Sequence, residues 1–212
     1  MSFVKLFGES WERSLRPFLT SPEFNQLGNA LNDLRKKVIV YPEKELIFKA
    51  FTDTPYDKVK VVLVGNINNR CIGSSYAYNL TPIEASIPLD TINLFKKLES
   101  DLNVLVIDPD SSFKSWKDQG VLFLNTSLTI GETSHNDLWK PFIYAVCQAL
   151  ENKGDIIYMF PTGLKEDLIN FDLFLNSEKS TFIQREDCFS TVNSVLYMRE
   201  EKEIDWSINN NS

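Results

Sequence analysis

Val59-Lys60-Val61-Val62-Leu63-Val64 is a run of mostly β-branched apolar residues that ends at Gly65. Apolar residues on both faces predict a central parallel strand that is buried on both sides. Gly65 lets the backbone turn sharply out of the sheet. In open α/β sheets, ligands bind at this carboxyl end of a strand. Residues 66–73 are therefore placed like an active-site loop, although they contain no carboxylate and no histidine.

Three further stretches read as strands, and they alternate with stretches that read as helices. The strands are predicted at residues 121–124, 155–160 and 180–183, and the helices at about residues 11–31 (in two pieces that part at Ser21-Pro22), 43–51, 89–102, 113–119, 139–152, 163–171 and 189–199. This alternation is typical of a parallel sheet with helices on both faces. We therefore expect an α/β fold, a three-layer sandwich with a central four-stranded, mostly parallel sheet. Residues 1–212 form one domain, with about 207–212 a frayed tail.

The composition excludes several classes of protein. Apolar residues make up 43% of the chain and the formal net charge is -7, which counts against strong non-specific binding to DNA and favours protein partners. No apolar run approaches the ~20 residues of a membrane span, so no membrane partner is expected. Cys71, Cys147 and Cys188 are scattered and read as free thiols in a reducing cytoplasm. With one histidine and no close cysteine pair, no metal or other cofactor is expected.

Short motifs along the chain resemble one enzyme family. Ser115-Trp116 is followed by Gln119-Gly120-Val121-Leu122-Phe123-Leu124-Asn125-Thr126, which is similar to a segment of the family-1 uracil-DNA glycosylases. Tyr41-Pro42, Ser134-His135 and Ile204-Asp205-Trp206 continue the resemblance in the same order. The resemblance runs from about Trp11 to Trp206 and implies the same sheet architecture.

The resemblance also implies a chemistry, the hydrolysis of the glycosidic bond of a uracil that is flipped out of the helix. In the family this reaction needs an aspartate at the end of the first strand and a histidine late in the chain. It also needs an aromatic ring under the base, an asparagine that reads the base edge, and an apolar wedge that holds the flipped state.

The loop after the first strand departs from the family pattern at four positions that matter for chemistry. Asn66 stands where the family has glutamine, and Ile67 stands where it has the catalytic aspartate. Asn69 replaces a tyrosine that blocks 5-methyl groups, and Arg70 replaces a histidine. Isoleucine carries no charge and takes no proton, so the family's carboxylate is missing from its usual position.

Other expected site residues are partly retained. Leu80 falls at the position of the base-stacking phenylalanine, whereas Asn125 matches the base-reading asparagine. The late loop corresponds to about residues 176–188, which contain no histidine and no proline. His135 matches a different position of the family.

These departures predict a catalytically inactive homologue, not an enzyme, that acts as a binding or scaffold protein. The expected partner is a protein of the replication or repair machinery, as for viral members that serve as polymerase processivity subunits. DNA is a weaker expectation. Two alternatives stay open: a non-cleaving reader of DNA bases, for which Asn69 leaves room beside carbon 5, and a weak glycosylase with a displaced catalytic group, Asp53, Asp118 or Glu132.

Most of the candidate binding residues also have an ordinary structural interpretation. Asn125 reads the base or forms a turn at the strand end. His135 replaces a catalytic group or occupies a helix cap or loop. Arg70, Lys96 and Lys97 contact phosphates or carry ordinary solvated charge.

Overall fold

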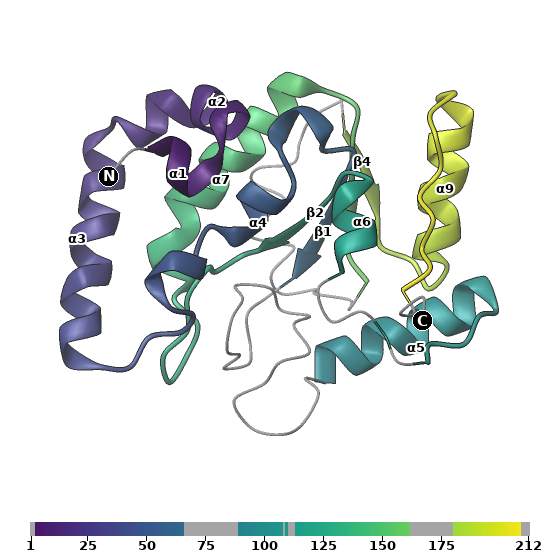
Figure 1. Ribbon diagram of the computed structural model, residues 1–212, viewed down its shortest axis with the longest axis horizontal. Coiled ribbons are helices and arrows are strands. Elements are labelled where there is room, and N and C mark those ends of the chain that lie inside the picture. The colour runs from purple at the N-terminus through teal and green to yellow at the C-terminus, as the bar shows by residue number, and fades with distance from the viewer. Residues whose placement is uncertain (1–2, 66–88, 108, 110–112, 162–179, 209–212) are drawn as a thin grey trace.

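The computed structural model describes residues 3–65, 89–107, 109, 113–161 and 180–208, and it shows these residues folded around a parallel sheet (Figure 1). The strands are β1 (Val61–Gly65), β2 (Val121–Asn125), β3 (Ile156–Met159) and β4 (Ser180–Ile183), in the order β2-β1-β3-β4. Each neighbouring pair is parallel. The predicted fold class, an α/β sandwich with a central four-stranded sheet, is confirmed.

Strand β1 lies in the interior of the sheet, as its composition predicts. All five of its residues are buried, and it pairs with β2 on one side and β3 on the other. The β1–β2 register ends with Gly65 opposite Asn125. Because the strands are parallel, the residues that follow each of them leave from the same edge of the sheet.

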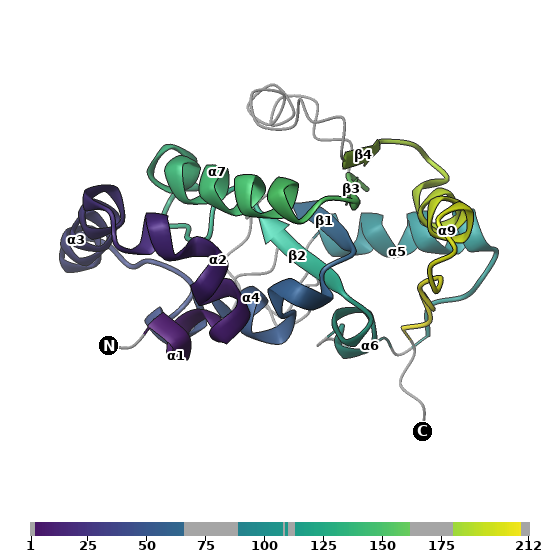
Figure 2. The ribbon, with the colours of Figure 1, turned by 90° about the horizontal axis from the view of Figure 1, so that it is seen from above.

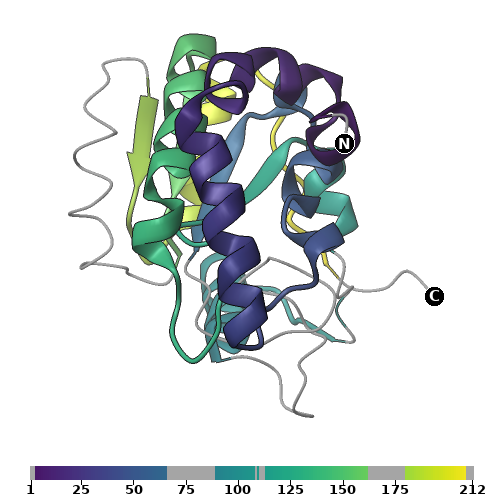
Figure 3. The same ribbon diagram turned by 90° about the vertical axis from the view of Figure 1, so that its left-hand side faces the viewer.

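The helices form layers on the two faces of the sheet. Their bounds are α1 (Phe3–Phe7), α2 (Glu9–Leu19), α3 (Pro22–Lys37), α4 (Lys49–Asp53), α5 (Leu89–Leu102), α6 (Lys114–Asp118), α7 (Asn136–Lys153) and α9 (Cys188–Met198), with 3-10 turns η1 (Lys44–Leu46) and η2 (Tyr56–Lys58). Figure 2 shows α7 on one side of the sheet and α5 with α9 on the other. In Figure 3, α3 lies alongside α7. Among the described residues, no helix has the length and apolar character to cross a membrane.

Capping residues close in the sequence fix the start of helix α3. The hydroxyl of Ser21 accepts a hydrogen bond from the Phe24 backbone N–H, and Pro22 takes the first position of α3, as the sequence predicts. The predicted helix at residues 43–51 is wrong, because Phe48 has non-helical angles (φ -103°, ψ 17°) between η1 and α4. The ring centroids of Phe48 and Phe7 lie 4.4 Å apart, so tertiary packing overrides the helical pattern here. The predicted helix at residues 163–171 lies outside the described residues.

Aromatic side chains fill the core on both sides of the sheet. Trp116 and Trp139 are fully buried. The indole N–H of Trp116 donates to the Trp206 backbone oxygen at 3.1 Å, so the core holds the C-terminal Ile204-Asp205-Trp206 segment in place. Cys147 and Cys188 are both buried free thiols.

Candidate active site

The carboxyl ends of β1 and β2 bring Gly65 and Asn125 together. They are the last pair of the β1–β2 register, and the backbone N–H of Thr126 donates to the Gly65 oxygen at 2.9 Å. Asn125 is only 3% exposed. A carboxamide offers two N–H donors and one acceptor oxygen, the groups needed to read the edge of a base. The retained asparagine therefore lies next to the point where the predicted active-site loop leaves the sheet.

The chain after Asn125 is stiffened by its own hydrogen bonds. The hydroxyl of Ser127 donates to the Thr129 backbone oxygen at 2.8 Å and accepts from the His135 backbone N–H at 3.1 Å. Ile130 forms bridges with both Tyr41 and Ser134. The turn after β2 thus fixes the direction in which the chain continues from Asn125.

His135 occupies the N-cap position of α7 and belongs to a buried hydrogen-bond chain. The hydroxyl oxygen of Thr129 lies 2.9 Å from His135 Nδ1 and 2.7 Å from Trp139 Nε1. An indole N–H is only a donor, so Thr129 accepts from Trp139 and its own hydrogen is available to His135 Nδ1.

The electrostatic environment of His135 favours the neutral ring. Burial disfavours the charged form, and the positive charge of Arg35 adds to the effect, so the pKa of His135 lies below its ordinary value of 6.5. Its Nε2 atom lies against Gly131, so close that a Cβ atom added to that glycine would approach it to 3.3 Å. The ring is therefore packed against the turn after β2, which matches the structural interpretation of His135.

The three carboxylates that are candidates for a displaced catalytic group lie at different ends of the sheet. Asp53 is ion-paired with Lys117 at 2.7 Å, and its neighbour Thr54 donates to the oxygen of Val121, the first residue of β2. Asp118 is three residues before the start of β2 and is ion-paired on α6. Both therefore lie at the amino end of the strand, away from Asn125.

Glu132 is the exception among these three residues. It lies in the turn after β2, between Ile130 and Ser134, and its side chain is exposed. This turn follows the carboxyl end of the strand, where Asn125 is the last residue. Of the three candidates, only Glu132 follows the carboxyl end of β2 in the chain.

The remaining predicted site residues are either outside the described residues or on the surface. Asn66, Ile67, Asn69, Arg70 and Leu80 all lie outside the described residues. Lys96 is exposed on α5, as the interpretation of solvated charge expects. Lys97 is not simply solvated, because its side chain is only 15% exposed and lies 3.5 Å from Glu186.

The interactions of Thr129 were not predicted from the sequence. In the sequence, the local sign of them is only a threonine six residues before the single histidine. Nothing in the spacing says that Trp139 joins the same hydrogen-bond chain, because that contact depends on how α7 packs against the turn.

Comparison with known proteins shows the family to which this chain belongs. The chain is 33% identical over 221 residues to a protein of Campylobacter curvus named uracil-DNA glycosylase, and the match covers 95% of this chain and 94% of that protein. A Fusobacterium nucleatum protein of the same name is 30% identical, over 94% of this chain and 96% of its own length. The chain belongs to the uracil-DNA glycosylase family. No family model matches the chain.

Solved structures support the same fold. A mimivirus uracil-DNA glycosylase matches with a TM-score of 0.81 at 20% identity, over 96% of this chain and 88% of that one. A variant of mimivirus UNG in complex with UGI matches with a TM-score of 0.82 at 19% identity, over 96% of this chain and 90% of that one. The sheet order and helix layers of this family member are thus those of the uracil-DNA glycosylase fold.

The comparisons contradict the prediction of a catalytically inactive homologue. Relatives that match this chain almost from end to end carry the name of the enzyme. Three related predictions are therefore wrong as well: a non-enzymatic scaffold, a replication or processivity factor, and a non-cleaving base reader. The prediction rested on the replacements at Ile67 and Leu80 and in two loops, whereas the similarity to the named enzymes extends over 95% of the chain.

Proposed function

We propose that this family member is a uracil-DNA glycosylase of DNA repair, which hydrolyses the bond between uracil and deoxyribose. The observation that carries the proposal is the position of Asn125, buried at the carboxyl end of β2 and paired with Gly65 at the end of β1. The end-to-end similarity to proteins named uracil-DNA glycosylase supports it.

Asn125 has the chemistry to distinguish uracil from cytosine. Uracil presents an acceptor at O4 and a donor at N3, whereas cytosine presents a donor at N4 and an acceptor at N3. A buried amide whose orientation is fixed matches one pattern and is mismatched with the other. Such a mismatch leaves buried polar groups unpaired, which is a strong basis for rejection of the wrong base.

The reaction also needs negative charge near the sugar, because positive charge develops there as the bond breaks. Ile67 supplies none. Glu132 is the carboxylate candidate on the Asn125 side of the sheet, and we propose that it takes this role. Its exposure means that water screens its charge, so we expect slow turnover compared with a site that has a buried carboxylate.

The direct test is release of uracil from a single-stranded oligonucleotide with one uracil, measured with enzyme in excess so that slow turnover is detected. Asn125→Ala should reduce the rate by about 10²-fold or more, as for loss of other preorganised hydrogen-bonding groups. Asn29→Ala, an exposed asparagine of α3, is the matched control and should leave the rate unchanged. No release by the unaltered protein at any enzyme excess would overturn the proposal.

A further inference from the structure

A small apolar pocket lies between helices α5 and α9 and the C-terminal segment of the chain. Leu98 and Leu102 of α5 line it, together with residues 104–106, Asn193 of α9 and residues 204–208. Figure 1 shows the C-terminal segment running alongside α9 toward α5. The pocket has a volume of about 260 Å³, below the ~300–1,000 Å³ of most small-molecule sites. This space fits one large apolar side chain better than a separate small molecule.

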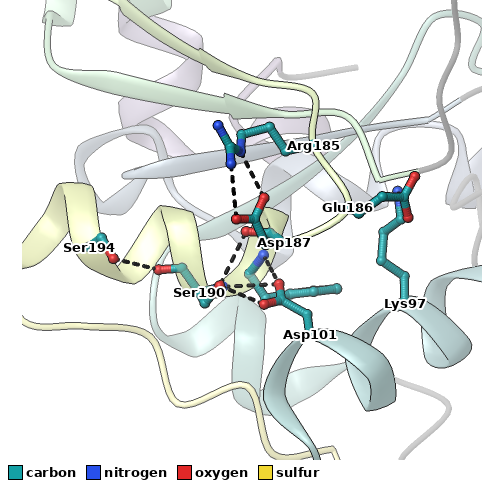
Figure 4. Close-up of polar contacts among 8 residues, drawn as sticks. Lys97, Asp101, Arg185, Glu186, Asp187, Ser190 and Ser194 are labelled. Atoms are coloured by element: carbon teal, nitrogen blue, oxygen red, sulfur yellow. Dashed lines mark hydrogen bonds and ion pairs between the residues drawn. The ribbon is translucent and has the colours of Figure 1, made fainter.

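Hydrogen bonds between the elements that form the pocket hold its walls in place. The Asp101 carboxylate on α5 accepts from the backbone N–H of Phe189 at 2.7 Å and from the Ser190 hydroxyl at 2.5 Å, which joins α5 to the start of α9 (Figure 4). The Asn193 side chain exchanges two hydrogen bonds with the backbone of Ile204, at 2.9 and 3.0 Å. A pocket that is formed before binding spares its occupant the cost of ordering it.

Apolar side chains extend from the pocket onto the surface. Val104 is 44% exposed and Leu105 is 72% exposed, and Ile107, two residues further on, is 65% exposed. Single exposed apolar residues are common on soluble proteins, whereas a group of them beside an apolar pocket is typical of an interaction site. These side chains offer further apolar area to whatever enters the pocket.

Trp206 adds a polar requirement to the pocket. Its side chain lines the pocket and is only 3% exposed, and its indole N–H has no hydrogen-bond partner among the residues that the structure describes. A buried donor without an acceptor is costly, so an occupant that brings an acceptor removes this cost. The backbone carbonyl of a peptide is such an acceptor.

The rim of the pocket carries negative charge. Asp205 lines the pocket and is exposed. The hydroxyl and the backbone N–H of Ser207 donate to its carboxylate, which lowers the pKa of Asp205 below its ordinary value. The preceding residues 200–203 contain three glutamates and one lysine. Charge complementarity therefore favours an occupant with basic groups around its apolar side chain.

We propose that this pocket binds a peptide segment of another protein in which lysine or arginine residues flank a large apolar side chain. The apolar side chain enters the pocket and a backbone carbonyl of the peptide accepts from the Trp206 indole. The basic side chains lie against Asp205 and residues 200–203. The pocket does not include Asn125, and this inference does not rest on the proposed function.

The test titrates a peptide of sequence Lys-Lys-Leu-Trp-Lys-Lys into the protein and follows the indole N–H signal of Trp206 by NMR. Lys-Lys-Ala-Ala-Lys-Lys and Glu-Glu-Leu-Trp-Glu-Glu are controls of the same length. We expect the first peptide to shift this signal with a Kd of about 0.1–1 mM, and each control to bind at least about fivefold more weakly. Equal affinity of the three peptides, or no shift of the Trp206 signal at about 5 mM of the first, would overturn the proposal.

A pair of variants tests whether the peptide occupies this pocket. Leu105→Gln removes apolar area from an exposed side chain that lines the pocket, so the fold should be retained while the Kd for Lys-Lys-Leu-Trp-Lys-Lys rises by about fivefold or more. Ile39→Gln makes the same change at an exposed residue that follows α3, at the other end of the molecule from α5 and α9 (Figure 2), and should leave the Kd unchanged. The same Kd in both variants would show that the peptide binds elsewhere.

A second copy of this chain is the competing occupant, because Lys36 and Lys37 precede the exposed Val38 and Ile39 at the end of α3. Sedimentation velocity of the unaltered protein distinguishes the two occupants, and we expect a monomer. Self-association that is abolished both by Ile39→Gln and by Leu105→Gln would assign the pocket to a second copy and overturn the proposal.

Discussion

The hydroxyl oxygen of Thr129 lies 2.9 Å from Nδ1 of His135, the single histidine of the chain. Thr129 also accepts from the buried Trp139 indole at 2.7 Å, and it is itself fully buried. The hydroxyl therefore joins the turn after β2 to helix α7. This link holds the segment that follows Asn125 in a defined position.

Removal of this hydroxyl should destabilise the fold. Thr129→Val keeps the shape of the side chain but leaves the Trp139 N–H buried without its acceptor, which costs about 1–3 kcal/mol of unfolding free energy. Urea denaturation measures the change. Thr133→Val makes the same replacement at an exposed residue of the same turn and should stay within about 0.5 kcal/mol of the unaltered protein. Equal stability of the two variants would contradict the role assigned to Thr129.

The stability of the protein should depend on pH through His135. Its pKa is lowered in the folded state, mainly by burial and also by Arg35, so the unfolded chain binds the proton more readily. The stabilisation is present above about pH 6.5 and is lost as the pH falls through the lowered folded pKa. Urea midpoints between about pH 7.5 and about pH 5.5 should fall for the unaltered protein and fall less for His135→Asn. The same slope in both would contradict this explanation.

The fold was predictable because short apolar stretches of the sequence identify its central strands. The two-sided apolar runs at 59–64 and 121–124 identify buried strands, and parallel pairing then brings Gly65 and Asn125 to the same edge. The short helix α1 and the break at Phe48 were not predictable, since both depend on an aromatic cluster assembled from distant segments.

The site was harder to predict than the fold. Asp53, Asp118 and Glu132 are equivalent candidates in the sequence, and only the structure separates them by the end of β2 at which they lie. The Thr129 and Trp139 contacts of His135 require the packing of α7. The prediction of lost activity was wrong because it rested on Ile67, Leu80 and two loops, whereas the similarity to named glycosylases is spread over the chain.

Gly120 is the glycine at which a side chain should be least tolerated. Its φ is +96°, and a Cβ atom added there would lie 2.2 Å from the Lys58 backbone oxygen. Gly120→Ala should therefore lower the unfolding free energy by about 2–4 kcal/mol, because it combines a backbone clash with a strained conformation. Gly28→Ala on α3 meets open space and should instead stabilise by about 0.5–1 kcal/mol. Thermal melts of the two variants should move in opposite directions, and a shift of the same sign would refute the argument.

Glu132 should matter for catalysis but not for folding. Glu132→Gln keeps the size of an exposed side chain and removes its charge, so the stability should be unchanged while the rate of uracil release falls by about fivefold, the effect of about 1 kcal/mol from a charge that water screens. Asp118→Asn is the matched control, because this exposed carboxylate lies at the opposite end of β2 and its loss should leave the rate unchanged. Single-turnover release from a single-stranded substrate gives the rate of the chemical step for each variant. If Glu132→Gln retains the rate of the unaltered protein within about threefold, the carboxylate that the reaction needs is not Glu132.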